Sequence, residues 1–315
     1  MVGDDGTESG ESTVGRPWKP VLGLSSDPTE PLTIPIPKGT VFDQPEPEDL
    51  LELTVIVPAR NEEDCLGACL NSLVQQSDQV FALGRDWELI VVDDQSTDRT
   101  AEIARSFGAT VIVRDWPGFA AQKNFAIDQC TGEWVLSLDA DEELSPELQT
   151  EIRELLESNP PSDAFYLKRR NLFLGRWIRH GGFYPDPKLR LFRRNSGHTP
   201  QFTERPVHEV IHFDGAAPTL ASDLIHHAYP TLASYIEHMN RYSTLSAPLL
   251  VTERRTSRSL PAFVAQVFFV PHLTFAKNYL FRLGFLDGRE GFLLHLYHAL
   301  YTSWKYAKAW ETGGR

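Results

Sequence analysis

Short apolar runs alternate with helix-like stretches between residues 51 and 163. The runs are rich in Val, Ile and Leu and lack polar alternation, which is typical of strands buried on both faces. Strands that alternate with helices of about 10–15 residues form right-handed βαβ units. We therefore predict an α/β fold with a mostly parallel, Rossmann-like sheet flanked by helices. The predicted strands are 53–57, 88–92, 110–113 and 133–138, and the predicted helices are 63–75, 98–107, 119–130 and 146–158, the last with Ser145 as N-cap.

The segments on either side of this pattern differ from it. Residues 1–50 hold eight prolines, six glycines and an excess of acids, so they cannot bury enough apolar surface to offset the entropy of ordering. We expect a disordered leader at 1–50, an α/β domain at 51–230 and a helical C-terminal region at 231–315. Within the domain, further strands are expected at 164–169, 188–193 and 207–213.

The formal charge of −13 is unevenly distributed. Residues 51–163 carry −16, whereas residues 164–315 carry +10 and all ten histidines. This division suggests two surfaces with different partners and disfavours nucleic acid as a partner of the whole chain. The three cysteines show no disulfide or zinc spacing, and the first 15 residues lack the features of a signal peptide, so we expect a cytoplasmic protein.

Ser259–Ala276 is an 18-residue stretch without a formal charge, at the lower edge of the length that spans a bilayer. Gln266, Pro271 and His272 interrupt it, and basic and aromatic residues follow it. This pattern favours an interfacial helix pair on an anionic membrane. A spanning helix and a core helix hairpin remain open.

Acidic residues follow three of the predicted strands, where an open parallel sheet binds its ligands. Asp139 and Asp141 come directly after the fourth strand, and carboxylates crowded in a cleft require a compensating cation. Mg²⁺ or Mn²⁺, completed by substrate phosphates, is the natural partner of oxygen ligands. We therefore predict a metal and diphosphate site at this Asp-x-Asp triplet.

The absence of two common nucleotide-binding motifs reduces the number of possible ligand classes. The chain has neither GxGxxG after the first strand nor GxxxxGK[ST], so neither a dinucleotide site nor a P-loop is indicated. Asp93 and Asp94, after the second strand, could accept hydrogen bonds from a nucleotide base. The alternative is an N-cap cluster in which Ser96 or Thr97 caps the next helix.

Three ordered segments resemble the signatures of the family 2 glycosyltransferases with the GT-A fold. They are Val55-Ile56-Val57-Pro58-Ala59-Arg60-Asn61-Glu62-Glu63, Val91-Val92-Asp93-Asp94-Gln95-Ser96-Thr97-Asp98 and Leu138-Asp139-Ala140-Asp141-Glu142. The second departs from the common pattern in having Gln95 where Gly is usual. Segments 180–193, 206–209 and 283–288 further resemble the bacterial subgroup that adds sugars to the lipopolysaccharide core.

This resemblance implies roles for the matching residues. Pro58, Ala59 and Glu62 would line the nucleoside pocket, and Asp93 or Asp94 would contact the uracil. Lys123 would approach the nucleotide or its diphosphate, unless it is an ordinary exposed helix lysine. Asp139 and Asp141 would hold the metal, Asp141 more directly.

Inversion by single displacement requires a carboxylate that takes the proton of the acceptor hydroxyl. Glu209 is the expected base, with Asp186 as the competing candidate and His208 as a metal or phosphate contact. The basic segment Lys168–Arg194 holds nine Lys and Arg and one acid, which suits an anionic saccharide or glycolipid acceptor. The alternative is a strand face that balances acidic residues within the fold.

The sequence thus predicts metal-dependent, inverting transfer of a hexose from a UDP-sugar in envelope glycan synthesis. Peripheral contact with the cytoplasmic face of the inner membrane follows from the helical region. A carboxylate- and metal-dependent phosphohydrolase and an inactive nucleotide-sugar binding module are the alternatives. The sequence does not identify the donor sugar, the acceptor or the oligomeric state.

Overall fold

The computed structural model describes residues 53–74, 87–194, 200–203, 210–213, 215–257 and 259–313. The predicted leader at 1–50 and the candidate residues His208 and Glu209 lie outside this part of the chain. All described residues belong to one compact unit.

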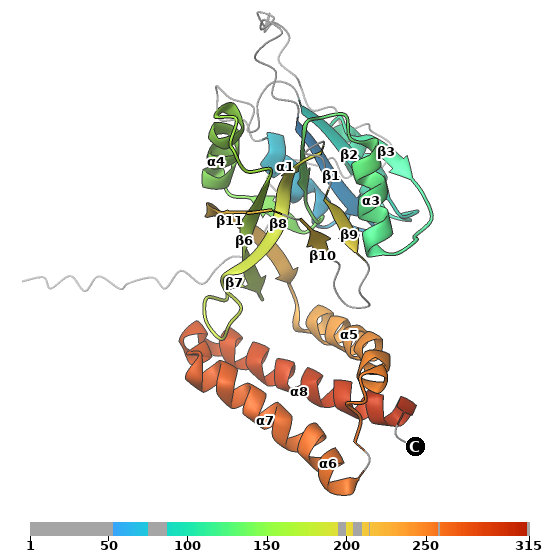
Figure 1. The fold of residues 1–315 in the computed structure, drawn as a ribbon, viewed down its shortest axis with the longest axis vertical. Coiled ribbons are helices and arrows are strands. Elements are labelled where there is room, and N and C mark those ends of the chain that lie inside the picture. Colours follow the sequence, from blue (N-terminus) through green and yellow to red (C-terminus); the bar gives the residue numbers. More distant parts are fainter. Residues whose placement is uncertain are drawn as a thin grey trace, which may run out of the picture. The chain divides into compact units, whose positions relative to one another are not determined.

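The first four strands form the predicted parallel sheet, in the order β3-β2-β1-β4 (Figure 1). Each predicted strand and helix in this part is present, with ends shifted by a few residues. The α/β class is therefore confirmed. The elements are β1 Leu53–Ala59, α1 Leu66–Val74, β2 Trp87–Asp93, α2 Thr100–Ser106, β3 Thr110–Val113, α3 Phe119–Gln129, β4 Trp134–Ser137 and α4 Pro146–Glu157.

Beyond β4 the sheet becomes mixed. β8 pairs antiparallel with β4 and with β6, β11 lies parallel to β6, and β5 closes the far edge antiparallel to β11. The mostly parallel sheet was thus predicted correctly only for its first half, and the sequence pattern did not predict β5 or β11. The added strands are β5 Glu142–Leu144, β6 Ala164–Phe173, β7 Arg176–Trp177, β8 Asp186–Arg193 and β11 Thr219–Tyr229, and a separate pair is formed by β9 Gln201–Thr203 and β10 Val210–His212.

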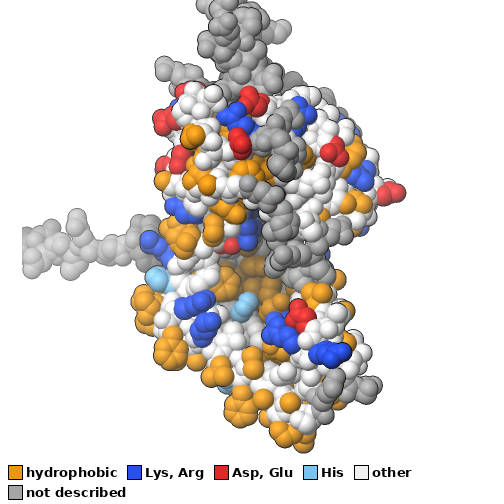
Figure 2. Space-filling model, in the orientation of Figure 1, with side chains coloured by type: hydrophobic (Ala, Val, Ile, Leu, Met, Phe, Trp, Pro, Cys, Tyr) orange, Lys and Arg blue, Asp and Glu red, His pale blue; other side chains and the backbone are white. Residues whose placement is uncertain are grey.

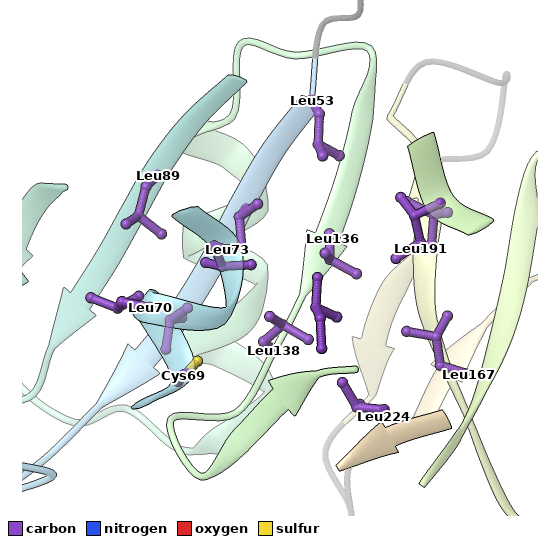
Figure 3. Close-up of a cluster of buried hydrophobic side chains, with 14 of the residues drawn as sticks. Leu53, Cys69, Leu70, Leu73, Leu89, Leu136, Leu138, Leu167, Leu191 and Leu224 are labelled. Atoms are coloured by element: carbon purple, nitrogen blue, oxygen red, sulfur yellow. The ribbon is translucent and has the colours of Figure 1, made fainter. Parts of the chain in front are cut away.

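Both faces of the parallel sheet are covered, which explains why its strands are continuously apolar. On β1, Val55 and Val57 face the core that contains α1, whereas Ile56 faces the core that contains α3. Figure 3 shows Leu70 and Leu73 of α1 beside leucines of the sheet. The Ser145 hydroxyl accepts a hydrogen bond from the Leu148 amide at 3.2 Å, which confirms the predicted cap of α4. Such a cap stabilises a helix by about 1 kcal/mol.

The C-terminal region is helical from Leu232. Helix α8 packs against both α5 and α7, and α5 begins with a capping box of Thr231 and Ser234. Helices α6 to η2 form one helical stretch, Leu260–Phe281, interrupted by two π-helical segments. The elements are α5 Leu232–Thr252, α6 Leu260–Val264, η1 Ala265–Phe269, α7 Val270–Phe275, η2 Ala276–Phe281, η3 Gly284–Asp287 and α8 Gly288–Gly313.

Candidate active site

The carboxyl ends of β1 and β2 meet at one edge of the sheet and place Asp93 and Asp94 there. Both side chains are buried. Asp94 forms a 2.7 Å ion pair with Arg60, which follows β1, and the Asp93 carboxylate accepts long 3.3 Å hydrogen bonds from the Ser96 amide. Because each carboxylate has about four acceptor positions, both retain capacity for a ligand.

The predicted cap of the second helix by Ser96 or Thr97 is wrong. Helix α2 begins at Thr100, and Asp98 accepts hydrogen bonds from the amide and hydroxyl of Thr100 at 3.0 and 2.5 Å. Ser96 instead accepts from the Asn61 amide at 2.9 Å, and the Thr97 amide donates to the Asn61 side chain at 2.8 Å. Asn61 has a left-handed backbone conformation, with φ 52°, so its loop relies on hydrogen bonds with Ser96 and Thr97. These contacts join the loops after β1 and β2.

Glu62, in the same loop, is partly buried and its amide donates to Thr100 at 2.7 Å. Burial raises the pKa of its carboxyl group, a hydrogen bond from the Cys65 thiol opposes that shift, and the charges of Asp141, Asp98 and Asp139 add to it. Carboxylates that repel one another across this edge make it a site that favours a cation.

Asp139, which follows β4, forms ion pairs with two basic side chains of the same chain. Its carboxylate pairs with Lys123 of α3 at 2.7 Å and with Arg190 of β8. Burial alone would raise the pKa of Asp139, but Arg190 and Lys123 hold it well below the usual range. Lys123 is only 2% exposed, so the alternative of an ordinary exposed lysine is wrong. Asp139 is therefore ionised at neutral pH by contacts within the chain.

A second carboxylate shares the same arginine. Glu142 is fully buried, and its carboxylate lies 2.6 Å from Arg190 and 3.4 Å from Arg169. It also accepts a hydrogen bond from the Asp139 amide at 2.9 Å. Burial alone would lower the pKa of Arg190, but Asp139 and Glu142 raise it. Together with Lys123 of α3, these residues form one charge cluster that joins the end of β4 to β5, β6 and β8.

Asp141 differs from Asp139 because its nearest ionisable partner is a histidine rather than a lysine and an arginine. Its side chain is 35% exposed and lies 3.3 Å from His226 Nε2 on β11. His226 Nδ1 in turn lies 2.6 Å from the Asn171 side-chain oxygen, which orients the ring. Burial alone would raise the pKa of Asp141, but His226 and, more weakly, Arg169 lower it. Asp141 is thus an ionised, accessible carboxylate beside an imidazole.

Asp186, the competing base, is held by two cations. Arg169 contacts it at 2.6 and 2.9 Å, and Lys188 at 3.0 Å. Although burial would raise the pKa of Asp186, Arg169 and Lys188 lower it.

The structure brings most of the predicted donor-site residues to one edge of the sheet, but it adds residues that the pattern missed. These are Arg169, Arg190, Glu142 and His226. The arginines were assigned to an acceptor surface as part of a basic run. The pairing of β8 with β4 and β6 reveals that Arg190 contacts Asp139 and Glu142 and that Arg169 contacts Glu142 and Asp186. No group of three or more His, Cys, Asp or Glu among the described residues forms a ready-made metal cage.

Parallel strands in the order β3-β2-β1-β4, continued by antiparallel β8 and ending in an Asp-x-Asp triplet after β4, define an α/β fold of the GT-A type. Residues 54–211 match the family described as glycosyl transferase family 2. The chain belongs to this family and is a glycosyltransferase.

Two curated relatives and one solved structure illustrate the similarity. The lipopolysaccharide core biosynthesis glycosyltransferase LpsC of Rhizobium meliloti (strain 1021) is 30% identical over 268 residues, which cover 83% of this chain and 93% of LpsC. The uncharacterized glycosyltransferase RT0209 of Rickettsia typhi is 28% identical over 250 residues, covering 77% and 81%. The mannosyltransferase PcManGT of Pyrobaculum calidifontis, solved with GDP-Man and Mn²⁺, has a TM-score of 0.48 at 18% identity, covering 82% and 86%.

Proposed function

We propose that this glycosyltransferase transfers a hexose from a UDP-sugar to a saccharide or lipid-linked acceptor with inversion at the anomeric carbon. We propose that it acts in the synthesis of lipopolysaccharide core or another envelope glycan, which is supported by the similarity to LpsC along most of both chains. The observation that carries the proposal is Asp141, an accessible carboxylate beside the cation-compensated Asp139 at the end of β4.

The nucleoside would bind where the loops after β1 and β2 are joined. Pro58, Ala59 and Glu62 line this edge, and Asp93 or Asp94 would accept from the uracil N–H. Lys123 would reach the diphosphate from its position beside Asp139. A lysine already paired with a carboxylate adds little net charge, so its contribution to diphosphate binding is one of orientation.

The residues at the end of β4 fit a divalent metal. Mg²⁺ and Mn²⁺ commonly use one or two protein carboxylates and complete their shell with water and substrate phosphates, so a full protein cage is not required. Asp141 is the principal proposed ligand, Asp139 the second, and His208 a further contact. Burial is the main cause of the raised pKa of Glu62, and the charges of Asp141, Asp98 and Asp139 add to it, which supports a cation here. When bound, the metal would stabilise the charge of the departing diphosphate.

The proton of the acceptor hydroxyl must go to a base. Glu209 is the proposed base, because the competing Asp186 is held by Arg169 and Lys188, which lower its pKa and weaken it as a proton acceptor. The base takes the proton while the acceptor oxygen bonds to the anomeric carbon and the bond between that carbon and UDP breaks. Because the oxygen attacks from the side opposite UDP, the configuration of the anomeric carbon is inverted.

The acceptor surface is narrower than the basic run suggested. Arg169 and Arg190 belong to the charge cluster, and Arg170 pairs with Asp223 at 2.9 Å. Arg179 stays exposed and lies 4.5 Å above the Trp177 ring, and Lys188, although paired with Asp186, keeps 43% of its side chain exposed. We propose that an anionic saccharide or glycolipid acceptor contacts these side chains, on the cytoplasmic side of the inner membrane.

One assay series tests the donor site. Thermal unfolding with UDP-sugars, with and without Mn²⁺, should show metal-dependent stabilisation, because a ligand that binds only the native state raises stability. Asp141→Asn should abolish the metal-dependent part. Glu143→Gln is the matched control, since Glu143 pairs with His227 at 2.7 Å rather than facing the site, and should retain it.

In the same series, Glu209→Gln should lower transfer by about 100-fold or more while metal-dependent UDP binding persists. Unchanged transfer would refute the base. Retained metal-dependent UDP binding in Asp141→Asn would refute the metal assignment. Release of phosphate or free sugar without transfer would favour the phosphohydrolase, and binding without any turnover the inactive module.

A further inference from the structure

The helical C-terminal region exposes a continuous series of large apolar side chains. Figure 2 shows hydrophobic side chains gathered along the lower end of the molecule, over α6 and α7. The most apolar 18-residue window within Leu260–Phe281 has a mean hydropathy of 1.2, and only 6% of it is buried. The most exposed side chains are Leu260 at 74%, Phe268 at 54%, Phe269 at 56%, Leu273 at 68%, Leu280 at 53% and Phe281 at 82%. We call these six residues the apolar face.

The opposite flank of the same helix is anchored to the rest of the chain. The Phe263 ring packs on Trp310 at 5.0 Å, the Ser303 hydroxyl of α8 donates to the Val267 carbonyl at 2.8 Å, and Phe275 packs on Phe292 at 6.0 Å. The helix therefore has a fixed orientation. The ring contacts of the apolar face in the described structure stay within the helix itself, where Phe268 contacts Phe269 and His272.

The stretch that bears this face has a positive formal charge, and the acids that border it and reach solvent include Glu253, Glu290 and Glu311. Residues 254–286 contain five Lys and Arg and no acid. The next acid, Asp287, is 2% exposed and accepts hydrogen bonds from Arg179 and His180, so it contributes little to the outer surface. Lys277 is exposed. Beside the face, a shallow hollow of about 570 Å³ is lined by Tyr279, Phe285, Gly288, Arg289, Phe292 and Leu293.

We propose that the apolar face lies in the interface of an anionic phospholipid membrane, with the helix parallel to the surface. Apolar side chains flanked by cations match acyl chains beneath phosphate headgroups. The aromatic hollow with Arg289 at its rim would take one such lipid. This goes beyond the transfer reaction and does not depend on its donor assignment.

Two other arrangements fit the observations less well. A membrane span would place Gln266, His272 and Lys277 of the stretch in the hydrocarbon, and it would have to carry α8, which packs along one flank, into the bilayer with it. A second copy of the chain would bring two sets of cations together, and the stretch 254–286 that bears the face has five cations and no acid to compensate them, so like charges would oppose pairing. Anionic lipid satisfies both the apolar and the charged parts of the surface.

The test is co-sedimentation of the full chain with vesicles of phosphatidylcholine alone and of equal parts phosphatidylcholine and phosphatidylglycerol. We expect binding to the mixed vesicles that weakens as salt is added, since exposed charges are screened. Phe269→Glu with Leu273→Glu and Phe281→Glu should lower the partition coefficient at least about tenfold. Leu245→Glu on α5, an equally large change at a side chain 41% exposed, should not.

A charge variant guards against misfolding of the triple variant. Lys277→Gln with Arg289→Gln should weaken binding to the anionic vesicles and leave the thermal response to UDP unchanged. Absence of vesicle binding by the unmodified chain, or equal binding by the triple variant, would overturn the proposal. Concentration-dependent self-association that the triple variant loses would assign the face to a second copy instead. Failure of UDP binding in the unmodified chain would count against the proposed reaction alone.

Discussion

At the scale of the residue, Asp139 shows how burial and charge decide a role that spacing alone leaves open. Lys123 and Arg190 compensate its charge from within the chain, and Arg190 is shared with the fully buried Glu142. A buried ion cluster contributes little net stability when complete, because desolvation offsets attraction. Removal of one member is a different matter, since it leaves a charge buried without a partner.

Arg190→Met should therefore lower the free energy of unfolding by about 3–5 kcal/mol, because Glu142 loses its main cation. Arg190→Lys keeps the positive charge but loses the guanidinium that contacts both Asp139 and Glu142, so the decrease in the free energy of unfolding should be smaller. Urea unfolding followed by circular dichroism measures both. Equal losses in the two variants would mean that side-chain packing, rather than charge, governs this position.

The candidate site was predictable to the extent that it follows strand ends. Asp93, Asp94, Asp139 and Asp141 come directly after apolar runs, so their common edge could be inferred from the sequence. Arg190 could not, because its neighbour across the sheet is set by the antiparallel pairing of β8 with β4, which no local pattern encodes. Glu209 and His208 stay predictions.

At the scale of the element, two segments that resemble the core-glycan subgroup lie in contact. In the loop before β8, the His180 amide and ring lie 2.8 and 2.9 Å from Asp287 of η3, and the Gly181 amide donates to the Arg282 carbonyl at 2.9 Å. Gly181 and Gly284 both lie directly against the His295 ring. The loop that leads to Asp186 is thus fastened to the helical region.

Gly181→Ala should be more destabilising than Gly175→Ala. Both glycines have positive φ, 71° and 79°, so an alanine is strained at either by about 1 kcal/mol. A Cβ at Gly181 would also lie 2.0 Å from His295, whereas Gly175 has open space, which adds about 1–3 kcal/mol of overpacking at Gly181. Thermal or urea unfolding of both variants measures the difference.

A second substitution checks the cause. His295→Ala in the Gly181→Ala background should recover part of the added loss, because it removes the obstructing ring. If the double variant is simply the sum of the two single variants, the clash with His295 is not the source.

At the scale of the whole molecule, His295 links stability to pH. The ring is 1% exposed, neither nitrogen has a hydrogen-bond partner in the described structure, and burial lowers its pKa to about 4. The charge of Asp287 opposes this shift only weakly. Above pH 6.5 the ring is neutral in both folded and unfolded chains. As the pH falls below 6.5, His295 becomes protonated in the unfolded chain, whereas in the folded chain it stays neutral until about pH 4. The free energy of unfolding therefore falls over this range.

His295→Gln should remove this loss. Between pH 7 and pH 5, the free energy of unfolding of the unmodified protein should fall by about 2 kcal/mol more than that of the variant. Comparison of the two proteins cancels the titration of groups that His295 does not influence, including His227, whose pKa is raised by Glu143 and whose contribution is lost as pH rises. Parallel pH profiles would show that His295 does not titrate differently on folding.

The fold was predictable where both faces of a strand are buried. Val55, Ile56 and Val57 read as a continuous run because each face of β1 has its own core. β11 was not predicted because Asp223 and His226 interrupt its apolar pattern. Their polar groups are satisfied by Arg170 and Asn171 of β6, partners that are 53 and 55 residues away in sequence. Only tertiary structure makes those residues compatible with a strand.

The pairing of Asp139 with Lys123 and Arg190 also bears on the entropy of ligand recognition. Immobilising a flexible side chain on association costs about 0.5–1.5 kcal/mol. Here folding has already ordered these long side chains against a carboxylate. The sugar-nucleotide donor that we propose for this edge of the sheet would therefore meet a preorganised set of charges, and its affinity would not be reduced by having to arrange them.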